Sequence, residues 1–187
     1  MKKLLPLSLF AIAAAMPAFA QNAMPAPKIV VLDRGAILQL TKAGQDIARQ
    51  LQQLANSNKA NFDAQQKSLA AESQQLRQQV AILAPDVRAK REEAFNAKVR
   101  SAQENAERRQ LQIQQAAATS QQALANALQP IVVELMKERG GNLVVDKSAV
   151  IFATNDAFNI TQAAIERLNA RMPTYKVTLG AAAPAKP

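Results

Sequence analysis

The stretch TKAGQDIARQLQQLANSNKANFDAQQKSLAAESQQLRQQVAILA, residues 41–84, contains one glycine, Gly44, and no proline. Its bulky apolar residues recur mostly three, four or seven positions apart, as Ile47, Leu51, Leu54, Phe62, Leu69, Leu76, Val80 and Leu83. This spacing predicts a long helix whose apolar stripe packs on a second helix, as in a coiled coil. The step from Leu54 to Phe62 departs from the repeat, which indicates a local stutter in a continuous helix.

A second periodic stretch runs from Asp86 to Arg139, with Phe95, Val99, Ala102, Ala106, Ile113, Ala117, Leu124, Leu128, Ile131 and Leu135 along one side. Pro85 interrupts the first pattern, and Asp86 is placed to cap the helix that follows. At 1.5 Å per residue, each helix would be about 65–80 Å long. Nearly equal helices around one breaker predict an antiparallel hairpin with its tip near residue 85; the alternative is a single rod kinked at Pro85.

Two signals mark the end of the second helix. Pro130 removes the hydrogen bond to the carbonyl of Asn126 and predicts a bend in the axis. Gly140 and Gly141 follow Lys137 and Arg139, a pattern typical of a helix C-terminus. We therefore expect residues 41–129 to form a projecting helical arm, and the helix from residue 130 onward to pack on a body.

Three apolar runs of strand length, residues 28–32, 142–146 and 149–153, lie outside the arm, followed by a predicted helix from Thr161 to Arg171. These pieces are too small to bury a stable core in one chain, and copies from other subunits would cover the open strand edges. We therefore predict an α+β fold with a small β-sheet or barrel body, residues 21–40 and 130–172, completed by trimerisation. The residues expected to build the trimer body are Ile29, Val31, Leu143, Val145, Val150 and Phe152.

The first 20 residues have the layout of a secretory signal peptide, with Lys2 and Lys3, an apolar run to Ala15, and Ala18-Phe19-Ala20 before the expected cleavage. The alternative, a membrane anchor, needs about 20 apolar residues, more than this run offers. Removing the two lysines lowers the formal net charge from +9 to +7. At the other end, residues 173–187 are expected to form a flexible tail.

The composition excludes several kinds of catalytic site. The chain has no cysteine, histidine or tryptophan, which rules out thiolate catalysis, zinc–thiolate sites, serine–histidine triads and imidazole metal sites. It also lacks a glycine-rich phosphate loop. Asp33, Asp146 and Asp156 lie at predicted element ends, where capping and turn roles are expected. We therefore predict no enzymatic activity, no metal and no cofactor.

Basic side chains gather near the predicted tip, where they outnumber Asp86, Glu92 and Glu93; they are Arg88, Lys90, Arg91, Lys98 and Arg100. Such a cluster can attract acidic partners or lipid phosphates over about 8 Å, the Debye length at physiological salt. The alternative is a solvated helix face with intrahelical ion pairs. Nucleic acid is not expected as a partner, because the arms lack a dense basic tract with stacking aromatics and the chain is predicted to be exported.

The ordered pieces, taken in sequence, resemble the Skp/OmpH family of periplasmic chaperones over nearly all of the predicted mature length. The residues that carry the resemblance are Lys28 to Asp33, Ile37, Leu38, Leu128 to Ile131, Gly140 to Asp146, Val150 to Ala153, Asn159 to Thr161, Ile165, Leu168 and Asn169. Their order around a long Gln- and Ala-rich insert is specific, although each is weak alone. Asn159 stands where the family usually has Asp, and Pro85 marks the tip unusually sharply.

The resemblance implies a homotrimer whose small β-barrel body carries three long arms around an unfolded client. The expected function is an ATP-independent periplasmic holdase for unfolded outer-membrane β-barrel proteins, with Arg88, Lys90, Arg91, Lys98 and Arg100 steering clients. The family also suggests weak contact with anionic lipid or lipopolysaccharide, for which this tip shows no defined motif. The alternative function is a structural coiled-coil adaptor of the cell envelope, which the arms alone would fit equally well.

Overall fold

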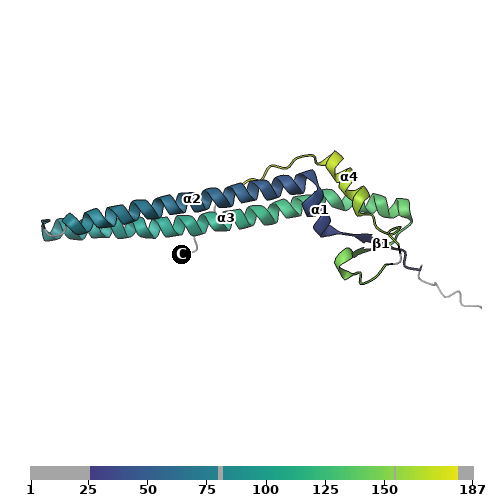
Figure 1. The fold of residues 1–187 in the computed structure, drawn as a ribbon, viewed down its shortest axis with the longest axis horizontal. Coiled ribbons are helices and arrows are strands. Elements are labelled where there is room, and N and C mark those ends of the chain that lie inside the picture. The colour runs from purple at the N-terminus through teal and green to yellow at the C-terminus, as the bar shows by residue number, and fades with distance from the viewer. Residues whose placement is uncertain (1–25, 80–81, 154, 181–187) are drawn as a thin grey trace, which may run out of the picture.

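Figure 1 shows a long two-helix arm with a small body at one end. The structure, a computed structural model, describes residues 26–79, 82–153 and 155–180. The predicted signal peptide, residues 1–20, lies outside these residues. The elements follow in the order β1 (Ile29–Leu32), α1 (Arg34–Leu40), α2 (Lys42–Gln79), α3 (Pro85–Arg139), β2 (Leu143–Asp146), a 3-10 turn (Lys147–Ala149) and α4 (Thr161–Arg171).

The arm consists of α2 and the first part of α3, which lie antiparallel and side by side (Figure 1). The predicted hairpin is therefore observed, and the kinked rod is not. α2 continues through residues 54–62, as expected for a stutter. Asp86 does not cap α3, because Pro85 already occupies the first turn and Ala84 is the N-cap, without a side-chain hydrogen bond. Pro85 has the fixed φ that suits this position, so the helix begins one residue earlier than expected.

The root of the arm is fixed by a tight corner at Thr41, which is fully buried. Its hydroxyl donates to the carbonyl of Ile37 at 2.6 Å and accepts from the amide of Gly44 at 3.1 Å, so it satisfies the end of α1 and the start of α2 together. The amide of Lys42 donates to Oδ1 of Asn169 on α4 at 2.7 Å. These bonds set the direction in which α2 leaves the body.

α3 runs without interruption through Pro130 and ends where the glycine pair predicted. Gly140 has φ 64°, the left-handed conformation that favours glycine. The amide of Gly141 donates to the carbonyl of Met136 at 2.8 Å, which closes the last turn. The chain then reverses directly into β2.

β1 and β2 form a parallel two-stranded sheet in which Ile29 pairs with Leu143 and Val31 with Val145. The third predicted strand, residues 149–153, is not formed. Asp146 accepts a hydrogen bond from the amide of Ser148 and starts a 3-10 turn. The free edge of β1 is bound by residues 158–160 instead, through a bridge from Val31 to Asn159. In the part of the chain that the structure describes, residues 150–153 pair with no strand.

The core lies where the inner face of the sheet, α1, α4 and the last turns of α3 meet. Its buried members are Val30, Leu32, Ile37, Ala43, Leu124, Leu128, Ile131, Leu135, Ile160, Ala164, Ile165 and Leu168, and the partly buried Val144 of β2 packs against them. Two ion pairs hold α4 on α3 at the rim, Arg167 with Glu138 at 2.6 Å and Arg171 with Glu134 at 2.8 Å. The Arg167 guanidinium lowers the pKa of the Glu138 carboxyl.

Residues 173–180, which we call the C-terminal strap, run from the end of α4 back across the arm (Figure 1). The carbonyl of Tyr175 accepts from Nε2 of Gln50 at 2.6 Å, and the amide of Val177 donates to Oε1 of Gln50 at 3.0 Å. The expectation of a flexible tail from residue 173 is therefore corrected for the strap, because its backbone is bound to α2. Residues 181–187 lie outside the described residues.

Within the described part of the chain, no helix combines the length and the apolar character needed to cross a membrane.

Candidate functional site

The outer face of the sheet is apolar and open to solvent. Side chains alternate along β1, so Val30 and Leu32 are buried while Ile29 is 43% exposed. Because the strands pair in register, Leu143, 46% exposed, and Val145 lie on the same outer face as Ile29 and Val31. An exposed apolar face of this kind is a candidate interaction surface.

This face borders a depression of about 900 Å³ lined on its other side by residues 150–153 and 155–158. Five of the six predicted body residues line it, namely Ile29, Val31, Val145, Val150 and Phe152, and Leu143 lies beside them on the sheet. Phe152 is 83% exposed and Ile151 fully exposed. Ile151, which lies in the apolar run predicted for the body but was not among the six named residues, also lines the depression, as does Phe158, which no sequence pattern marked.

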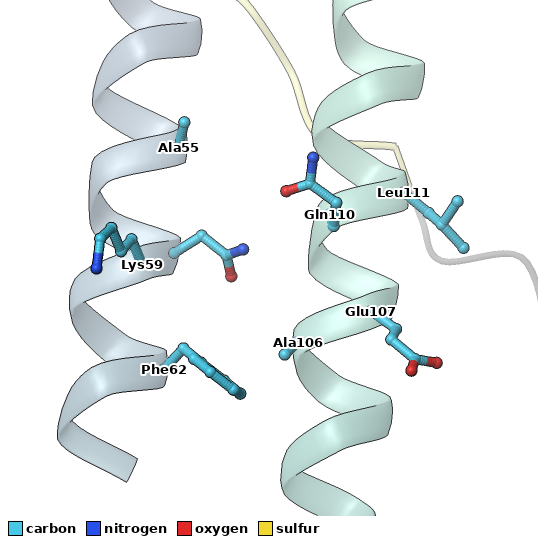
Figure 2. Close-up of a pocket in the computed structure, with 8 residues that line it drawn as sticks. Ala55, Lys59, Phe62, Ala106, Glu107, Gln110 and Leu111 are labelled. Atoms are coloured by element: carbon cyan, nitrogen blue, oxygen red, sulfur yellow. The ribbon is translucent and has the colours of Figure 1, made fainter. Parts of the chain in front are cut away.

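The arm has a second opening where the heptad repeat breaks. Figure 2 shows Phe62 of α2 and Ala106 and Gln110 of α3 facing the space between the helices, while Leu111 points away from α2. The opening has a volume of about 610 Å³. Because the small Ala106 lies opposite Phe62, the side chains do not fill the space between the two helices at this level. The predicted stutter thus coincides with a loose part of the seam.

The basic residues near the tip all lie in the first turns of α3, but they differ in their surroundings. Arg91 donates to Oε1 of Gln79, and Nζ of Lys98 contacts Oε1 of Glu72 at 2.5 Å, so both residues link α3 to α2. Lys90 and Arg100 are exposed, and Arg88 is half-buried. The contacts of Arg91 and Lys98 are thus interhelical rather than the intrahelical pairs considered above.

Asp146 joins the sheet to α1 at the junction of body and arm. Its carboxylate accepts from the hydroxyl of Ser148 at 2.6 Å and from Nε of Arg34 at 2.6 Å. The Ser148 hydroxyl, then Arg34, hold the pKa of Asp146 far below its usual range. Asp33 likewise accepts from the amide of Ala36 at 2.8 Å at the start of α1. Both aspartates therefore have the capping and turn roles that the sequence predicted.

Among the described residues, no group of three or more acidic, histidine or cysteine side chains is arranged to hold a metal ion.

The family model for outer membrane protein (OmpH-like) matches residues 28–168, about three quarters of the chain. The chain belongs to the OmpH-like family. The resemblance predicted from the sequence is thereby confirmed, and the match covers every element from β1 to most of α4. A search of the curated proteins gives no match for this OmpH-like chain.

Among solved structures, the OmpH-like chain is similar to a candidate outer membrane chaperone (OmpH-like) from Caulobacter crescentus CB15. The TM-score is 0.74 at 18% sequence identity, with 90% of this chain and 95% of that chain covered. At this identity the likeness establishes the fold. The long helices and small sheet are thus features shared with a solved OmpH-like structure.

Proposed function

We propose that this OmpH-like chain is an ATP-independent holdase chaperone of the periplasm, which binds unfolded outer-membrane β-barrel proteins and keeps them from aggregating. Family membership and the similarity to the Caulobacter protein support a chaperone role. The observation that carries the proposal is the distal arm, defined as residues 58–79 and 85–101, in which no described side chain is buried. A long surface of half-exposed apolar groups offers weak, distributed contacts, which suit reversible binding of many sequences.

The aggregation of a urea-denatured outer-membrane β-barrel protein, diluted into buffer without nucleotide, tests this function. The full chain is expected to reduce light scattering in proportion to its concentration. A variant in which residues 59–106 are replaced by a short Gly-Ser linker keeps the body and the root of the arm, and it should lose this effect. Equal protection by both proteins would contradict the assignment to the arm. Failure of both, with a stable complex formed with a folded envelope protein, would favour a coiled-coil adaptor.

A homotrimer is the proposed assembly, with the outer face of the sheet as its centre. The face is apolar, its depression is open, and residues 150–153 pair with no strand among the described residues. Pairing between subunits would give the backbone amides and carbonyls of residues 150–153 hydrogen-bond partners, and it would cover Ile151 and Phe152.

The basic residues near the tip are proposed to accelerate capture of acidic clients, while the arm surface supplies the affinity. Exposed charges act mainly on association rates. Changing Arg88, Lys90 and Arg91 together to Gln should slow association several-fold at low salt, with little change in dissociation, in stopped-flow mixing with a labelled client. Lys98 and Arg100 are expected to add smaller effects, since Lys98 is already paired with Glu72. Faster, salt-independent dissociation would instead indicate direct contact.

The same cluster is proposed to give weak, salt-sensitive binding to anionic lipid or lipopolysaccharide. The proposed function involves no enzymatic reaction, no cofactor and no nucleic acid.

A further inference from the structure

The C-terminal strap has the pattern of a half-buried β-strand. Tyr175, Val177 and Leu179 are half-buried, whereas Lys176 and Thr178 between them are exposed. This alternation of apolar and polar residues is typical of an extended segment with one face packed. The strap also lies beyond residue 168, where the match to the family model ends. It is therefore an addition to the part of the chain that the family model describes.

The side-chain amide of Gln50 binds the strap as a neighbouring strand would. It contacts the carbonyl of Tyr175 and the amide of Val177, which point to the same edge of an extended chain. One residue of a parallel strand binds this same pair of groups. Nε2 of Gln50 also donates to the carbonyl of Asp46 in its own helix at 3.3 Å, which orients the amide. These contacts recognise backbone and place no demand on the side chains bound.

The remaining contacts of the strap also place little demand on the sequence of the bound segment. The side chain of Tyr175 packs against the buried core of the body. At the other end, Nε2 of Gln112 on α3 donates to the carbonyl of Gly180 at 3.3 Å. Figure 2 shows the strap passing beside α3 at this level. None of the ion pairs found among the described residues includes Lys176. An alternating extended segment can therefore be held here through backbone and apolar contacts.

We propose that the surface under the strap, centred on Gln50, is a binding site for extended segments of unfolded clients, and that the strap occupies it as an internal competitor. The inference rests on the proposed function and deepens it by naming a place on the arm root where a client binds. Strands of outer-membrane β-barrels alternate apolar and polar residues in the same way. A client strand can thus replace the strap, bond to Gln50, and place its apolar side chains where Tyr175, Val177 and Leu179 lie.

Because the strap is covalently linked to α4, it competes effectively but reversibly with client segments for the surface around Gln50. A short flexible linker gives an effective concentration on the order of 1 mM. If the strap binds this surface with an intrinsic dissociation constant of about 100 μM, a client segment binds about tenfold more weakly to the strapped protein than to a protein with a released strap. Single strands would therefore bind weakly, whereas a long client that also contacts the distal arm could displace the strap.

The experiment compares full-length proteins with docked and released straps. The released-strap variant carries Tyr175→Ser, Val177→Ser and Leu179→Ser, and Val177→Pro offers a second release by removing the amide that binds Gln50. The probe is a fluorescein-labelled peptide with the sequence of residues 173–180, measured by fluorescence anisotropy. A peptide of the same composition, with Tyr, Val and Leu adjacent, is the control. The alternating peptide should bind both released variants about tenfold more tightly than wild type, and adding Gln50→Ala should remove the gain.

Equal peptide binding by wild-type and released proteins would overturn the proposal, as would tight binding that is unaffected by Gln50→Ala or by the loss of alternation. Released variants that melt at lower temperature and bind no peptide would also overturn it, because the strap would then serve only to fasten the arm. Aggregation suppression by the wild type, measured in parallel, tests the proposed function separately. Suppression without peptide binding by the released variants refutes this inference alone; peptide binding without suppression refutes the holdase function alone.

Discussion

In the body, Ile131, Ile160 and Leu168 have no exposed surface, whereas in the distal arm every described side chain retains contact with solvent. Both regions contain Leu, Val and Phe. The difference lies in the number of neighbours: a body residue is enclosed by α1, α3, α4 and the sheet, but an arm residue meets one partner helix across a single seam. Apolar spacing therefore predicts which face of a helix packs, while enclosure decides how much stability the packing adds.

The comparison also separates two roles. A densely packed body holds the arm roots in fixed directions, as the Thr41 corner does for α2. The arm, which has a loose seam at Phe62 and Ala106, can bend and leave apolar groups accessible.

The largest expected effect is on assembly, at the uncovered face of the body. The double variant Leu143→Asp and Phe152→Asp should lose the proposed trimer and sediment as a monomer at micromolar concentration, because each subunit would bury two unpaired charges. Leu111→Asp, at an exposed apolar position of the arm, is the matched control and should sediment as wild type. A trimeric mass for the double variant would contradict the proposed interface.

The next effect compares the two regions directly. Leu168→Ala should lower the free energy of unfolding by about 2–5 kcal/mol, because the side chain is fully buried and leaves a cavity. Leu69→Ala, at a half-buried arm position, should cost about 1 kcal/mol or less, since solvent already reaches the site. Urea titrations followed by circular dichroism measure both. Similar costs for the two variants would show that the arm is as well packed as the body.

Gly44→Ala tests the corner between the regions. An alanine Cβ would lie 2.1 Å from the carbonyl oxygen of Leu38, a backbone atom that cannot move without opening the corner. Elsewhere in a helix, Gly→Ala adds about 1 kcal/mol of stability. At position 44 we expect the free energy of unfolding to fall by about 1–3 kcal/mol. Thermal melting gives the sign, and a stabilised variant would show that α1 and α2 join more loosely than the structure indicates.

The smallest effect concerns pH. Because the pKa of Asp146 is lowered far below its usual range in the folded protein, its contribution to stability is fully present above the unfolded value of about 3.8 and is lost progressively as the pH falls from there through the folded pKa. Asp146→Asn should therefore lower the melting temperature slightly at pH 7 and by a smaller amount at pH 3. Asp156→Asn serves as the control. A difference between wild type and Asp146→Asn that persists unchanged at pH 3 would argue against the ion pair with Arg34.

The helices were predictable because their signals are local: the apolar spacing of α2 and α3, the break at Pro85 and the glycine pair after Arg139. The sheet was only partly predictable. Residues 149–153 have strand composition, but Asn159 binds the free edge of β1, and nothing in the local sequence around 149–153 reveals this pairing. The docking of the strap was not predicted from the alternation of Tyr175 to Leu179, because the Gly-, Ala- and Pro-rich residues that follow are typical of a mobile tail. The partners of Arg91 and Lys98 depend on the hairpin register, which spacing alone does not fix.

The parallel pairing of β1 with β2 has a consequence for the order of folding. Ile29 pairs with Leu143, so the whole arm must be synthesised before the sheet can form. Closing so long a loop in an unordered chain is slow, whereas helices and a hairpin form through local contacts in microseconds. We therefore expect the arm to fold first and to bring the two strands together by shortening the loop. Until then β1 is an unpaired apolar segment, chemically much like the polypeptides that the finished arm is proposed to protect.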